Sequence, residues 1–225
     1  MRKLLFLPLL FVFTAFMCEA DEFVDTETLE EVAFEASFPD AEPGEVVVEA
    51  GGAIATMMPD YISGGYDNDG CSISDEEVDV IGLALSQENA DGSVLHLSIR
   101  VLDVVEDQID IALEPTLECL VYTWYNTRVR FRMYLREADG TISDVYLSNP
   151  ELGGEGFIEI SDFIAPICCD LGTFYGFEPD EDLFGFVSGV FDVLLHHEDT
   201  SEPLRIRGRI NRIPLVHAFE TSPYL

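Results

Sequence analysis

Hydrophobic and polar residues alternate strictly in two segments of the chain. In the first segment, Leu95, Leu97, Ile99 and Val101 are separated by single polar residues. In segment 128–136, apolar residues alternate in the same way with arginines and one tyrosine. Successive side chains of a strand point to opposite faces, so a period of two predicts strands with one buried face.

Turn residues separate several segments of this kind. Asp-Gly between two alternating segments is a strong indication of a β-hairpin, because these residues accept the backbone conformation of a tight turn. The sequence predicts three hairpins: 80–87 with 93–102 across Asp91-Gly92, 128–136 with 141–148 across Asp139-Gly140, and 187–196 with 204–213 across the polar loop from His197 to Pro203.

Shorter strand patterns complete the prediction of an all-β fold. Weaker strands are expected at 46–57, 109–113, 119–125 and 157–160. About ten short strands without a long helix favour antiparallel pairing, and a two-sheet sandwich or jelly roll buries one face of each sheet. A closed barrel is the alternative.

The first twenty residues have the pattern of a secretory signal peptide. Arg2 and Lys3 precede an apolar run from Leu4 to Met17, which is too short for a comfortable membrane span. Cleavage after Ala20 would release a soluble protein. Alternatively, Cys18 is the lipid acceptor of a bacterial lipoprotein.

The remaining chain divides by composition into a tether and a domain. Residues 21–44 are acidic and contain two prolines, which predicts an extended tether. Residues 45–225 contain no Ser/Gly-rich or Pro-rich linker, so a single β-sandwich domain is expected there.

The charge of the chain excludes several partners. Its formal net charge is −33, and Lys3 is its only lysine. Nucleic-acid binding requires a basic surface for the phosphates, so no nucleic-acid partner is expected. Anionic membranes are excluded on the same ground, which leaves a lipid on Cys18 as the one expected membrane contact.

Four cysteines remain once Cys18 is removed or lipidated. They are Cys71, Cys119, Cys168 and Cys169. An even number of cysteines in an exported protein predicts two disulfides. A bridge between neighbours needs a strained ring, so Cys71 and Cys119 are each expected to pair with one member of the 168–169 pair. The spacing of the cysteines does not match a zinc site.

Six arginines are the strongest candidates for a binding site. The alternation places Arg128, Arg130 and Arg132 on one strand face, and Arg205, Arg207 and Arg209 on another. Such arginines pair with acids on neighbouring strands or protect edge strands from aggregation. They are also suited to an anionic ligand, because guanidinium binds carboxylate and sulfate in a bidentate manner.

A calcium site is the only cofactor that the sequence suggests. Asp67-Asn68-Asp69-Gly70 is similar to part of a calcium loop, with Asp67, Asp69 and Glu76 at ligand positions. The first ligand position is Gly65 and flanking helices are absent from the pattern. A solvated loop is the competing interpretation, and no other cofactor is expected.

The C-terminal hairpin resembles that of a group of exported proteins. Residues 189–194, a polar turn and residues 206–215 are similar to the closing hairpin of uncharacterised exported bacterial β-sandwich proteins, many of which are lipoproteins. The resemblance covers this hairpin only. It implies a β-sandwich in the cell envelope and no activity.

Motifs of the common hydrolases are missing from the sequence. There is no nucleophile elbow, zinc-protease motif or phosphate loop. The strand Glu159-Ile160-Ser161-Asp162 is similar to the catalytic strand of laminarinase-like glycosidases, but Ser161 and Ile164 stand where two acids are required.

We therefore expect a non-catalytic exported protein, periplasmic, anchored to the outer membrane or secreted. Its expected partner is an envelope or surface component such as a polysaccharide. Two alternatives remain open: a carbohydrate-active enzyme with an unrecognised carboxylate pair, and a purely structural or assembly protein.

Overall fold

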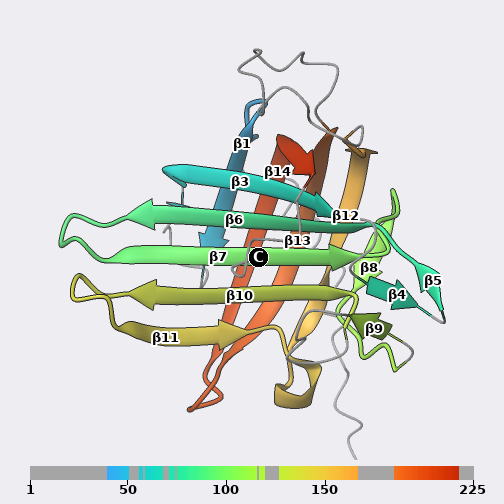
Figure 1. Ribbon diagram of the computed structural model, residues 1–225. Helices are drawn as coiled ribbons and strands as arrows, with labels where there is room; N and C mark the ends of the chain where they lie inside the picture. Colours follow the sequence, from blue (N-terminus) through green and yellow to red (C-terminus); the bar gives the residue numbers. More distant parts are fainter. Residues whose placement is uncertain are drawn as a thin grey trace, which may run out of the picture. The chain divides into compact units, whose positions relative to one another are not determined.

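Strands make up most of the computed structural model (Figure 1). The structure describes residues 40–50, 56–57, 59–67, 71–73, 75–115, 117–119, 127–166 and 185–217. The large sheet contains β1 (Glu45–Ala50), β2 (Thr56–Met57), β3 (Tyr61–Asp67), β6 (Val80–Glu88), β7 (Val94–Leu102), β8 (Gln108–Asp110), β10 (Val129–Arg136), β11 (Ile142–Leu147), β12 (Glu155–Ile164), β13 (Gly185–His197) and β14 (Pro203–His217). The small sheet contains β4 (Cys71–Ile73), β5 (Glu76–Glu77) and β9 (Leu117–Cys119), and η1 (Pro150–Leu152) is a short 3₁₀ helix. The prediction of an all-β fold is confirmed.

The three predicted hairpins are present as β6–β7, β10–β11 and β13–β14, each antiparallel. Both Asp-Gly turns have the glycine in the left-handed region, with φ of 83° at Gly92 and 89° at Gly140. The preceding aspartates secure the turns. Asp91 accepts hydrogen bonds from the backbone and hydroxyl of Ser93, and Asp139 accepts one from the backbone of Thr141. These local contacts explain why the hairpins could be predicted from short segments.

Strands β3, β4 and β5 were not predicted. β3 contains Gly64 and Gly65, which weaken a strand pattern because they have no side chain to pack. At Gly64 there is no room for a side chain, since a Cβ there would overlap the carbonyl oxygen of Pro214 on β14. The close approach of β14 therefore requires a glycine at this position of β3.

Two bulges fold the large sheet back on itself. On β14, Arg212 has a φ of 49° and lies where the pairing with β13 shifts register. On β11, Asp144 has the same φ and lies where the pairing with β10 shifts. A bulge bends its strand and increases the local twist. Beyond the first bulge β14 pairs in parallel with β3, and beyond the second β11 pairs with β13.

The folded sheet forms two groups of strands that cross in Figure 1. We call β3, β6, β7, β10 and β11 the front strands, and β1, β14, β13 and β12 the back strands. One hydrophobic cluster combines buried residues of both groups, so the core lies between them. At its centre the rings of Phe131 and Phe191 have centroids 5.0 Å apart and connect a front strand with a back strand.

The predicted sandwich of two separate sheets is not confirmed. The two groups of strands belong to one hydrogen-bonded sheet, which is mixed because β14 and β3 run parallel. The described residues from 40 onward belong to one compact unit. The predicted signal peptide at 1–20 and most of the tether at 21–44 lie outside the described residues. None of the described residues belongs to a helix long and apolar enough to cross a membrane.

We predict that Gly208→Ala destabilises the fold by about 3 kcal/mol, because overpacking a filled core forces side chains and backbone to move. A Cβ at Gly208 would overlap the ring of Phe191. Urea unfolding of the oxidised protein measures the loss. The matched control is Gly140→Ala, where a Cβ meets nothing within 4 Å and only the positive φ of the turn opposes it; we expect about 1 kcal/mol there. Equal losses at both positions would contradict this account of the core.

Candidate functional site

Arginines gather on the outer face of two adjacent front strands. Ile99 and Val101 of β7, and Val129 and Phe131 of β10, point into the core. Alternation therefore directs the residues between them outward. The outward set includes Arg100 on β7 together with Arg130 and Arg132 on β10, all three half-buried. We call these three residues the front arginine patch.

Two arginines of the front patch face each other directly. The β7–β10 register places Arg130 opposite Arg100 and Arg132 opposite Ser98. Directly opposed like charges destabilise a sheet unless another group compensates for them. The pKa of Arg100 is lowered by burial, and the negative charge of Asp67 opposes this shift. One Nη atom of Arg100 also donates a hydrogen bond of 3.4 Å to Sγ of Cys71.

Aromatic rings extend the front patch along the same strands. Tyr134 on β10 stacks on His96, its partner on β7, with centroids 4.8 Å apart. The guanidinium of Arg132 lies 4.7 Å from the centre of the Tyr134 ring. The pKa of His96 is lowered, first by burial and then by the positive charge of Arg136. His96 is therefore neutral at pH 7, and the positive charge of this surface comes from the arginines.

Arg128, the third predicted arginine of this stripe, has an internal role. One of its Nη atoms donates to the backbone oxygen and the carboxylate of Asp103. Asp103 directly follows β7 and has a φ of 54°. The ion pair therefore supports the start of β10 against the end of β7, and the ligand-binding role of Arg128 stays a prediction.

The second predicted stripe, on the back strands, is paired with acids. Asp192 of β13 is nearly buried, with its side chain 8% exposed. Arg205 contacts both of its carboxylate oxygens, at 2.7 and 2.9 Å, and Arg207 contacts one at 3.1 Å. Arg209 makes an ion pair of 2.9 Å with Asp40. For Arg205 and Arg207, the interpretation as cross-strand charge balance fits the geometry, while the acid that pairs with Arg209 lies outside the strands.

The sequence did not single out Arg100, His96 or Tyr134 as site residues. Arg100 belongs to the first alternating segment, and the hairpin next to it was predicted correctly. What was missing is the register between β7 and β10, which are adjacent in the sheet but separated in the chain by residues 103–128. No turn connects these strands directly, so the opposition of Arg100 and Arg130 was not visible in the sequence.

The predicted calcium ligands fall on separate elements. Asp67 ends β3 and Glu76 belongs to β5, while Asp69 lies outside the described residues. Within the described part of the chain, no three His, Cys, Asp or Glu side chains are close enough to hold a metal ion. The negative charge of Asp67 acts on Arg100, so Asp67 lies close to the front arginine patch.

Two of the four cysteines occupy opposed backbone positions in the small sheet. The β4–β9 register places Cys71 directly opposite Cys119. Cys71 is buried, in a small cluster with Val80 and Leu102. Cys168 and Cys169 lie outside the described residues, so their predicted pairing with Cys71 and Cys119 stays a prediction.

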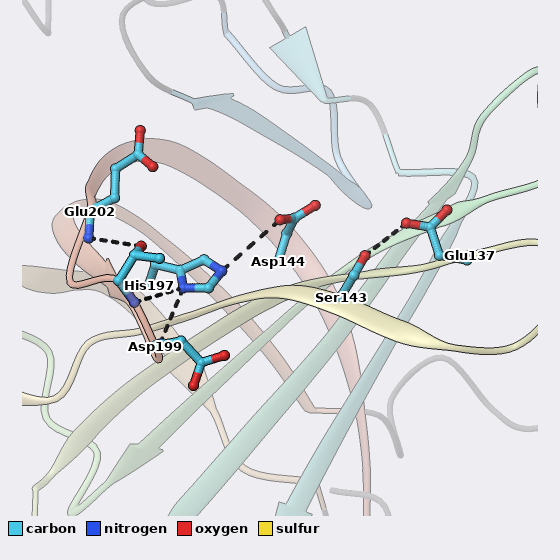
Figure 2. Close-up of polar contacts among 7 residues, drawn as sticks. Glu137, Ser143, Asp144, His197, Asp199 and Glu202 are labelled. Atoms are coloured by element: carbon cyan, nitrogen blue, oxygen red, sulfur yellow. Dashed lines mark hydrogen bonds and ion pairs between the residues drawn. The ribbon is translucent and has the colours of Figure 1, made fainter.

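A polar cluster lies where β11 meets β13 (Figure 2). Nδ1 of His197 accepts hydrogen bonds from the backbone N–H groups of Asp199 and Thr200, at 3.2 and 3.3 Å. Its Nε2 lies 4.0 Å from a carboxylate oxygen of Asp144, the bulge residue of β11. The imidazole thus joins the β13–β14 turn to the bulge. This arrangement favours a structural role for His197.

We predict that Asp192→Asn lowers the free energy of unfolding by about 2–3 kcal/mol, because Arg205 and Arg207 lose the buried charge that both contact. Urea unfolding at neutral pH measures this loss. Asp40→Asn is the control, since Asp40 is 93% exposed and its ion pair with Arg209 is screened by solvent. No measurable change is expected for the control, and a comparable loss there would contradict the distinction.

We predict that a non-reducing peptide map links Cys71 to Cys119. Opposed residues of an antiparallel ladder have Cα atoms roughly 4.5–5.5 Å apart, which is within the range that a disulfide spans. The two thiols would lose two protons and two electrons to a disulfide oxidant of the export compartment. A map that links each of them to the 168–169 peptide would instead support the pairing predicted from the sequence.

The chain matches no protein-family model, and it is similar to no curated protein and to no solved structure. The function is therefore inferred from the arrangement of its own residues.

Proposed function

We propose that this protein is an exported, non-catalytic module of the cell envelope or cell surface that binds an acidic glycan through the front arginine patch. In this proposal the two crossing groups of strands act as a β-sandwich, and export follows from the signal-like N-terminus. Cleavage after Ala20 or a lipid on Cys18 would deliver the domain to the outside.

The observation that carries the proposal is the opposition of Arg100 and Arg130 across the β7–β10 ladder. On the back strands, two arginines share the buried carboxylate of Asp192. On the front strands, Arg100 and Arg130 lie opposite each other, and in this proposal a bound anion accepts charge-assisted hydrogen bonds from both.

The surroundings of the patch suit an extended anionic polymer. Arg130 and Arg132 are two residues apart on one strand, which separates them by about 7 Å along the sheet. A polymer that carries repeated charges can contact both. On the same outer face, the register leads from His96 across β6 to Tyr61, the first residue of β3. Tyr61 is exposed, and a sugar ring could contact it.

Long-range electrostatics works against an anionic ligand. The net charge of −33 repels an anionic polymer until salt screens the repulsion, which at physiological ionic strength occurs over about 8 Å. The half-buried contacts of the patch are screened much less. Binding should therefore be examined at physiological salt and above.

The test is a polysaccharide array probed with the mature protein at about 0.15 M salt and at about 0.5 M salt. We expect binding to acidic glycans and none to neutral ones. The double variant Arg130→Gln/Arg132→Gln should weaken binding at least tenfold, because a hydrogen bond to a charged group contributes about 1.5–3 kcal/mol. The control is Arg209→Gln/Arg212→Gln, which removes the same charge from the back strands.

Two outcomes would overturn the proposal. Absence of binding to every glycan would favour a structural or assembly role, with the arginines as internal charge balance. Turnover of a bound glycan would favour the carbohydrate-active enzyme.

A further inference from the structure

We propose that a disulfide between Cys71 and Cys119 is a redox latch, which keeps the small sheet closed over a second apolar core of the domain. This second core is the buried cluster of Cys71, Val80 and Leu102, and it is separate from the large cluster between the front and back strands. The inference goes beyond the proposed glycan binding and does not depend on it.

The second core lies on the outer face of the front strands. Val80 of β6 and Leu102 of β7 are opposite each other in the register, next to the pair of Ile81 and Val101. Ile81 and Val101 belong to the main core, so the neighbouring pair points to the other face of the sheet. Val80 is nevertheless only 6% exposed and Leu102 only 1%. Another part of the chain therefore covers this apolar pair.

The small sheet supplies the cover. Cys71 on β4 is 3% exposed and belongs to the same buried cluster. Ile73, two residues further along β4, packs against the cluster, as does Val78 after β5. Alternate residues of β4 thus face the large sheet. One Nη atom of Arg100, on the outer face of β7, adds the hydrogen bond of 3.4 Å to Sγ of Cys71.

Backbone pairing by itself holds the small sheet weakly. β4 pairs with β5 over two pairs of residues and with β9 over three, and such short pairings are marginally stable in water. β4 lies in the connection between β3 and β6, whereas β9 lies in the connection between β7 and β10. A disulfide between the opposed Cys71 and Cys119 joins these two connections covalently. It favours the closed small sheet because it restricts the open chain.

Opening of the latch is a two-electron reduction. A dithiol reductant attacks one sulfur of the disulfide, and the bond between the two cysteine sulfurs breaks. Both cysteines become thiols, which together take up two electrons and two protons, and the reductant is oxidised to a disulfide. Because the two apolar clusters are separate, we expect the small sheet to open while the main core stays folded.

The experiment measures hydrogen exchange of the full mature protein, oxidised and after reduction with dithiothreitol. The reporter of the latch is the backbone N–H of Val78, which donates to the backbone oxygen of Cys71. The N–H groups of β13 report on the main core. The variant Cys71→Ala/Cys119→Ala removes the latch without a reductant. The matched control, Cys168→Ala/Cys169→Ala, removes the other two cysteines and keeps the latch.

In the oxidised protein, we expect the N–H of Val78 to be protected from exchange. Reduction, or the variant Cys71→Ala/Cys119→Ala, should make its exchange about 100-fold faster, because a disulfide disfavours the open chain by a factor of this order. The N–H groups of β13 should remain protected in every case. Before reduction, the control variant should exchange as the unsubstituted protein does.

Three results would overturn the latch. If Val78 stays protected without the disulfide, packing alone keeps the small sheet closed. If Val78 and β13 lose their protection together, the small sheet is part of one cooperative unit with the main core. If Cys168→Ala/Cys169→Ala opens the small sheet as far as Cys71→Ala/Cys119→Ala does, the disulfides follow the pairing predicted from the sequence.

Discussion

The bending of β14 and β11 at their bulges is the constraint on which the rest of this structure depends. Without the left-handed backbone of Arg212 and Asp144, the ladder would continue as an open sheet with one apolar face exposed to solvent. The bulges instead bring β14 to β3 and β11 to β13. The apolar faces then meet, and Phe131 contacts Phe191 across the core.

This closure also explains several residues that local patterns leave unexplained. Gly64 is required where β14 approaches β3, and Gly208 is required where the ring of Phe191 lies over β14. His197 joins the turn of β13–β14 to the bulge of β11 (Figure 2). Each of these residues serves a contact between segments far apart in the chain.

The distribution of charge follows from the same architecture. The inward faces are apolar, so charged residues are confined to the two outer faces. On the back strands, the buried carboxylate of Asp192 forms ion pairs with both Arg205 and Arg207. On the front strands, the register opposes Arg100 and Arg130 and places His96 on Tyr134. The two faces thus differ in arrangement: on the back strands two arginines share one buried carboxylate, and on the front strands two arginines lie opposite each other.

The sequence by itself determined the all-β class, the three hairpins and the inward and outward positions of their strands. Each of these depends on neighbours in the chain, such as the side chain of Asp91 at its turn or the period of two around Ile99. The tertiary structure alone decided that one ladder folds back at Arg212, that β3 belongs to it, and that Arg100 faces Arg130. Register between strands without a tight turn depends on how the whole core packs, and no short segment carries that information.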